Sequence, residues 1–132
     1  MDLNFQYAHH QSDESDTTHN ISKEDALNAF EQFDWDGEVE KANQLNNCSP
    51  TLSILVNGSS EMIWVSGVGS HKCSAFTSEC CFPGEVKRLF GLYKSQGTIS
   101  LYSDCLNKAK AREAIELFLE KDYKGLEKLY RE

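Results

Sequence analysis

The sequence lacks both a long apolar run and an N-terminal secretory signal. Its apolar runs are short, such as Met62–Val65, whereas a membrane-spanning helix needs roughly 20 such residues. Residues 1–10 provide neither the basic stretch nor the apolar stretch of a signal peptide. We therefore expect a protein of the cytoplasm that does not enter a membrane.

The sequence also lacks the cysteine spacing of a disulfide framework. Its cysteines are five, an odd number, and no regular pairing is visible among them. Free cysteine is among the most buried residue types and packs as a small apolar side chain. We expect reduced thiols at all of these positions, which are Cys48, Cys73, Cys80, Cys81 and Cys105.

Recognisable catalytic motifs are missing as well. Gly67-Val68-Gly69 lacks the later glycine of a dinucleotide-binding loop, and no Gly-x-Ser-x-Gly elbow is present. Outside the polar N-terminal residues the only histidine is His71, so a general base for a Ser or Cys nucleophile is scarce. The sequence favours a binding protein over an enzyme.

One group of metal-ligating residue types needs separate consideration. His71 and Cys73 precede Cys80 and Cys81, and Cys105 would complete a zinc site. The spacing fits neither common zinc pattern, and adjacent cysteines on a strand point to opposite faces. We expect no metal and no other cofactor. The histidines at positions 9, 10 and 19 are interpreted as part of a solvated segment.

Acidic residues are concentrated in one half of the chain. Residues 1–66 carry twelve acidic and two basic side chains, whereas residues 67–132 carry nine and eleven; the net charge is −8. The acidic half would repel phosphate backbones, which argues against direct nucleic-acid binding. It would attract a basic partner and speed its association. The alternative is that these charges only keep the protein soluble.

The length of 132 residues and a hydrophobic content of 39% suit one domain. Residues 1–20 are expected to form a flexible acidic segment, in which Leu3, Phe5 and Tyr7 alternate and can add an edge strand. Residues 21–132 are expected to form a single α+β domain. Its elements are N-terminal helices, an antiparallel meander of about five strands, and a C-terminal helix packed on the sheet.

Three stretches have the apolar spacing of helices. The first begins at the N-cap Ser22, and a second begins at Asp36-Gly37 and ends near residues 46–47. Val39, Ala42 and Leu45 should line the buried face of the second helix. The closing helix begins after Asn107, and Gly125 is expected to interrupt it. Its predicted buried stripe is Ala111, Ala114, Ile115, Phe118 and Leu119.

The middle of the chain has the alternation of strands. The strongest pattern is a hairpin over Leu52–Val68 with Asn57-Gly58 in its turn. A third strand is predicted over 72–78, and a break follows at Pro83-Gly84. Residues 86–93 fit either a strand or a helix, and we favour a strand. A loop over 94–97 then leads to a last strand over 98–103.

A dense acidic cluster is the predicted partner-binding site. It surrounds a tryptophan, a residue type enriched in interface hot spots, and its carboxylates would complement a basic cleft. The alternative is that Trp35 packs in the core, Asp36 caps a helix, and the remaining acids form a solvated face. The candidate residues are Glu31, Asp34, Trp35, Asp36, Glu38 and Glu40.

The back half of the chain resembles the immunity proteins that accompany bacterial polymorphic and contact-dependent growth-inhibition toxins, in particular the Imm1-like group. The resemblance covers roughly residues 50–120. It lies in the order of four segments: Thr51–Val56, Ile63–Gly69, Thr98–Tyr102 and Ala111–Leu119.

This resemblance implies a non-enzymatic cytoplasmic inhibitor that binds a cognate toxin domain. Many such toxins are nucleases or other nucleic-acid-modifying enzymes with basic clefts, which an acidic inhibitor would suit. Two other classes stay open. One is a small acidic adaptor or nucleic-acid mimic, and the other is a small cysteine- or zinc-dependent enzyme.

Overall fold

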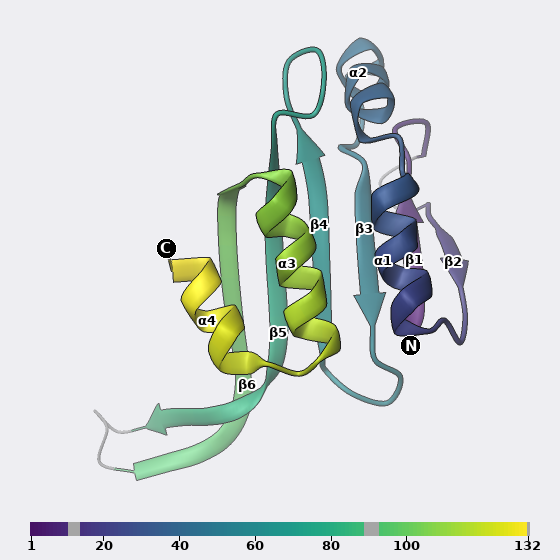
Figure 1. Cartoon of the computed structure of the whole chain (residues 1–132). Helices are drawn as coiled ribbons and strands as arrows, with labels where there is room; N and C mark the ends of the chain where they lie inside the picture. The colour runs from purple at the N-terminus through teal and green to yellow at the C-terminus, as the bar shows by residue number, and fades with distance from the viewer. Residues whose placement is uncertain (11–13, 89–92, 132) are drawn as a thin grey trace.

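The computed structural model describes residues 1–10, 14–88 and 93–131, with side chains given outside 86–95. Within them, four helices accompany one antiparallel sheet of six strands in the order β2-β1-β3-β4-β5-β6. The predicted α+β class is confirmed, with six strands instead of about five (Figure 1). The elements are β1 (Asp2–Gln6), β2 (Asp16–Thr18), α1 (Lys23–Gln32), α2 (Trp35–Leu45), β3 (Thr51–Leu55), β4 (Met62–Val68), β5 (Ala75–Arg88), β6 (Tyr93–Leu106), α3 (Lys108–Leu119) and α4 (Tyr123–Arg131).

The N-terminal residues contribute two strands to this sheet, although the sequence predicts a flexible segment with at most an edge strand. β1 is an interior strand, because it pairs with β2 on one side and β3 on the other. Leu3 lies opposite Ile54 and is buried, which attaches the segment to the core. β2 forms the edge, and its side chains are all exposed, so its sequence carries no apolar alternation. Residues 11–13 lie outside the described residues.

The first two helices begin at side chains that cap them. Ser22 and Asp25 form a reciprocal capping box at α1, as the sequence predicts for Ser22. α2 is capped by Asp34, two residues before the predicted Asp36. Asn46 ends α2 in the left-handed conformation, with φ of 51°. Leu45 was expected on the same face as Val39 and Ala42, but it is the last residue of α2 and is 58% exposed.

The β3–β4 hairpin is confirmed. Ile54 lies directly opposite Ile63 in the register, and both side chains are completely buried. Gly58 has a φ of 72° in the connecting turn, a conformation that glycine adopts without steric cost. The alternating residues of both strands therefore divide between a buried face and an open face of the sheet.

The next two strands are much longer than predicted. β5 starts at Ala75 instead of residue 72 and continues through Pro83-Gly84, and β6 includes the predicted loop over 94–97. The predictions of a break at Pro83-Gly84 and of a loop over 94–97 are therefore wrong. Of the predicted strand over 86–93, residues 86–88 belong to β5 and residue 93 to β6, whereas 89–92 lie outside the described residues.

A local reason explains why proline and glycine do not break β5. The pairing of β4 with β5 ends at Cys81, so β5 has a free edge beyond it, where proline is tolerated. A side chain at Gly84 would come within 2.4 Å of Ile99 Cδ1 on β6. Here the glycine allows two strands to approach closely. The β5–β6 pair continues past the end of β4 and curves away from the sheet (Figure 1).

The C-terminal part contains two helices instead of one interrupted helix. Asn107 caps α3, and the five predicted residues of its apolar stripe are all buried. α3 ends at Leu119, and Lys121 follows in the left-handed conformation. Gly125 lies inside α4, where its N–H donates to Asp122 Oδ1 at 3.0 Å. The turn between the helices is therefore made by residues before Gly125.

All of the packing helices lie against one face of the sheet. α1, α3 and α4 stand in front of the strands, and α2 lies at one end of them (Figure 1). The core between these layers includes Phe30, Leu52, Ile63, Phe76 and Ile115, each 2% exposed or less. Among the described residues, no helix has the length and apolar character required to span a bilayer.

This packing predicts the cost of shortening the two central isoleucines. Ile54→Ala and Ile63→Ala should each lower the free energy of unfolding by about 2–5 kcal/mol, because each leaves a cavity under the helices. Leu55→Ala is the control, since Leu55 is adjacent in sequence but 38% exposed on the other face. Urea unfolding curves give the three values. An equal loss in all three variants would contradict the division of the sheet into two faces.

Candidate functional site

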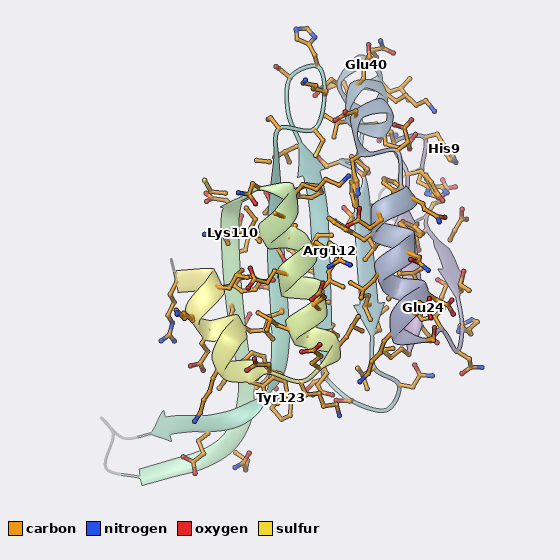
Figure 2. All side chains as sticks on the ribbon, viewed as in Figure 1. His9, Glu24, Glu40, Lys110, Arg112 and Tyr123 are labelled. Atoms are coloured by element: carbon orange, nitrogen blue, oxygen red, sulfur yellow. The ribbon has the colours of Figure 1, made fainter. Side chains whose placement is uncertain are left out.

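The predicted acidic cluster does not form one continuous surface. Glu31 is exposed at the end of α1, where its Oε1 accepts from Arg112 Nε at 2.7 Å. Arg112 extends from α3 towards α1 and also contacts Glu116 within its own helix (Figure 2). Glu31 therefore joins the acidic and basic halves of the chain. Its carboxylate remains 43% exposed beside this ion pair.

Two further carboxylates support the backbone around the start of α2. Asp34 Oδ1 accepts from the Gly37 N–H at 3.1 Å as the helix cap. Asp36 Oδ1 accepts from the Cys73 N–H at 2.9 Å, which ties the β4–β5 loop to α2. Both side chains remain exposed. They can still meet a partner, but neither can be exchanged without a structural effect.

Trp35 belongs to the core. Its side chain is 4% exposed, its Nε1 donates to the Phe30 carbonyl at 3.0 Å, and its ring packs edge-on against Phe76 with centroids 5.0 Å apart. The interface interpretation required an exposed indole, so the core interpretation is the correct one. The burial depends on apolar neighbours distant in sequence. It could not be predicted from the residues next to Trp35 in the sequence, because these are mostly acidic.

Glu38 is also buried, at 7% exposed. Its Oε1 accepts from the Ala8 N–H at 3.1 Å, and its Oε2 contacts Lys41 Nζ at 3.2 Å. The carboxylate therefore anchors the chain after β1 to α2. Glu40, two residues further on, is exposed in the middle of α2 and is the least embedded member of the cluster (Figure 2).

A pocket of about 310 Å³ lies where α1, α2, α3 and the β4–β5 loop meet. It brings Asp34, Trp35 and Asp36 together with Cys73, and Lys108 adds the one ammonium group among its lining residues. Burial raises the pKa of the Cys73 thiol, so the thiol stays protonated at neutral pH. The remaining lining residues are Phe33, Ser74 and Phe76. The pocket offers two carboxylates and one cation to a ligand, without an activated nucleophile.

The two adjacent cysteines lie on opposite faces of β5. Cys80 is buried under the helices, where burial raises the pKa of its thiol to about 12. Cys81 is next to it in sequence and belongs to the opposite face, as the strand alternation predicts. All five cysteines are free thiols. Within the described part of the chain, no group of three or more His, Cys, Asp or Glu side chains could hold a metal ion.

Two polar contacts that attach α4 to the rest of the domain were not predicted from the sequence. Glu61 is 7% exposed and accepts a hydrogen bond from the Tyr123 hydroxyl, with Lys121 Nζ 3.9 Å away. Burial, followed by the contact with Glu61, raises the pKa of Tyr123 to about 12. Ser78 Oγ lies 2.6 Å from the Tyr130 hydroxyl. The apolar spacing of α4 predicts that Tyr130 is buried, but not which polar group it meets.

The strand order turns the charge asymmetry of the sequence into a spatial one. β2, β1 and β3 with α1 and α2 form one side of the molecule, and β5, β6, α3 and α4 form the other (Figure 1). Lys23 and Lys41 are the basic residues on the first side. Its exposed carboxylates are Glu14, Asp16, Glu24, Asp25, Glu31, Asp34, Asp36 and Glu40.

No protein-family model, curated protein or solved structure matches this chain. Its function is therefore inferred from its own residues and their arrangement.

The two neighbouring glutamates of α2 give a matched test of the structural roles described above. Glu38→Ala should lower the free energy of unfolding by about 1–3 kcal/mol, because it leaves the N–H of the buried Ala8 without its acceptor. Glu40→Ala should change it by no more than about 0.5 kcal/mol, as expected for an exposed position. Urea unfolding of both variants measures the difference. Equal stabilities would contradict the assignment of Glu38 as an internal anchor.

Proposed function

We propose that this chain is an immunity protein that binds and neutralises a cognate protein toxin. The toxin would be a nuclease or another nucleic-acid-modifying enzyme, and its basic surface would bind this chain. The observation that carries the proposal is the acidic side of the molecule, where eight exposed carboxylates stand beside two lysines, Lys23 and Lys41, among the described residues. The order of segments that resembles immunity proteins supports the same conclusion.

The structure narrows the set of residues that would meet the toxin. Trp35 and Glu38 are buried, so they are not part of the contact surface. Glu31, Asp34, Asp36 and Glu40 remain exposed and form its carboxylate component. Asp34 and Asp36 are held in place by their hydrogen bonds to the backbone, so they lose little conformational freedom when a partner binds.

Inhibition of this kind needs no chemistry from the inhibitor. A carboxylate surface attracts a basic toxin over a distance, raises the association rate, and then occupies the surface that the toxin uses for its phosphate-bearing substrate. The protonated thiols of Cys73 and Cys80 agree with a binding role, since a thiol acts as a nucleophile only as the thiolate.

The proposal is tested with the toxin domain encoded beside the gene for this chain. Expression of that domain should arrest growth, and co-expression of this chain should restore it. A purified mixture should form a stable complex of the two proteins. If co-expression does not restore growth and no complex forms, the proposal is contradicted, and the acidic adaptor or nucleic-acid mimic becomes the better interpretation.

The role of the acidic side is tested by charge reversal at exposed helix positions. Glu24→Lys combined with Glu40→Lys should lower the association rate about tenfold at low salt, because both changes weaken the attraction of the basic toxin. Glu113→Lys combined with Glu120→Lys is the matched control: it changes the net charge equally from exposed positions in the other half. Stopped-flow kinetics at two salt concentrations give the rates. Equal reductions in both variants would place the contact elsewhere.

A further inference from the structure

The face of the sheet opposite the helices has no protein layer over it among the described residues. Its side chains include Met62 and Trp64 of β4, both partly exposed, as well as Leu55 and Tyr102. Leu55 is 38% exposed and Tyr102 is 57% exposed. Serine and threonine residues such as Ser53 and Ser66 surround them. The centre of this open face is therefore apolar and aromatic, with a polar margin.

The strand register places a carboxylate between the two aromatic side chains. Trp64 on β4 lies opposite Glu79 on β5, and Glu79 lies opposite Tyr102 on β6. Directly opposed residues of neighbouring strands have Cβ atoms about 5 Å apart. The three side chains thus form one row across the open face. Leu55 and Met62 lie opposite each other in the next row.

Among the side chains that the structure describes, none places a cation against the carboxylate of Glu79. Ser100 Oγ donates to Glu79 Oε2 at 3.2 Å. This hydrogen bond uses part of the accepting capacity of the carboxylate but does not balance its charge. Among the strand residues with described side chains that face this side, none is a lysine or an arginine. A partly buried carboxylate with aromatic neighbours gains most from a cation supplied by another molecule.

Arginine is the side chain that fits this row. Its planar guanidinium can bind a carboxylate through two donors and stack on aromatic rings at the same time, whereas the lysine ammonium is a compact, strongly hydrated charge. Tryptophan and tyrosine are the rings that attract cations best. Leu55 and Met62 offer an apolar surface to the residue beside the arginine.

We propose that the open face is a docking surface for a polypeptide segment that inserts an arginine between Trp64 and Tyr102 and onto Glu79. The surface lies on the other side of the sheet from α1, so its ligand leaves the acidic helices accessible (Figure 1). The proposal goes beyond the immunity function and does not depend on it.

The preference of the open face for an arginine side chain is tested with a small probe, the dipeptide acetyl-leucyl-arginine amide. Acetyl-leucyl-citrulline amide is the control ligand, because its side chain keeps the planar shape without the charge. Titration followed by ¹H–¹⁵N spectra should shift the Trp64 indole signal and leave that of the buried Trp35 unchanged. The citrulline probe should bind about tenfold more weakly, on the scale of a hydrogen bond to a charged group. Equal binding of the two probes would overturn the proposal.

Substitutions in the protein show where on its surface the arginine probe binds. Glu79→Gln and Tyr102→Ala should each weaken arginine binding about tenfold, whereas the matched changes Glu113→Gln on α3 and Leu45→Ala on α2, both at exposed positions, should leave it unchanged. The thermal midpoint of each variant shows whether it is folded. Shifts centred on α1 and α2 would overturn the proposal. It would also be overturned if sedimentation showed a dimer whose interface covers Trp64, since the occupant would then be a second copy.

Discussion

Burial of only one face of the sheet is the constraint on which the rest of the structure depends. The side chains of β3, β4 and β5 alternate between a completely buried set, such as Ile54, Ile63 and Cys80, and a set that faces away from the helices. Because the period of a strand is two, a slip of one residue would exchange these sets and expose the core. The same alternation places Trp64 and Glu79 outside, where the helices do not cover them.

The sheet keeps neighbouring parts of the chain close together, so the two halves of the sequence become two sides of the molecule. This arrangement concentrates the net negative charge on one side of the molecule, and the Glu31–Arg112 pair is a direct contact between the sides. It also explains why acids are dense around α2. Asp34 caps the helix, Asp36 holds the β4–β5 loop, and Glu38 anchors the chain after β1. Part of the acidic cluster is thus structural.

Local patterns predicted the elements whose signals lie within a few residues. The cap at Ser22, the turn at Gly58 and the buried stripe of α3 are of this kind, and all three are confirmed. Pro83 and Gly84 are local signals for a break, but pairing with β6 outweighs them. β2 has no apolar alternation because it is fully exposed. These errors arise where contacts distant in sequence decide the structure.

In the candidate sites, too, the features set by local sequence were predicted, and the features set by contacts distant in sequence were not. Composition was sufficient to identify an acidic half, but the burial of Trp35 and Glu38 depends on residues from other elements. The row of Trp64, Glu79 and Tyr102 was not predicted, because it exists only through the register of three strands. Recognising it from sequence would have required the direct pairing of β5 with β6, whereas the predicted third strand ended at residue 78 and a separate strand over 86–93 followed it.

Solvent paramagnetic relaxation of the free protein tests the one-sided sheet most directly. A soluble gadolinium chelate broadens NMR signals in proportion to their exposure. The account predicts strong broadening of the Trp64 indole and Met62 methyl signals, and little effect on the Trp35 indole or the methyl groups of Ile54 and Ile63. Protection of Trp64 and Met62 equal to that of the isoleucines would contradict it, since the face described as open would then be covered.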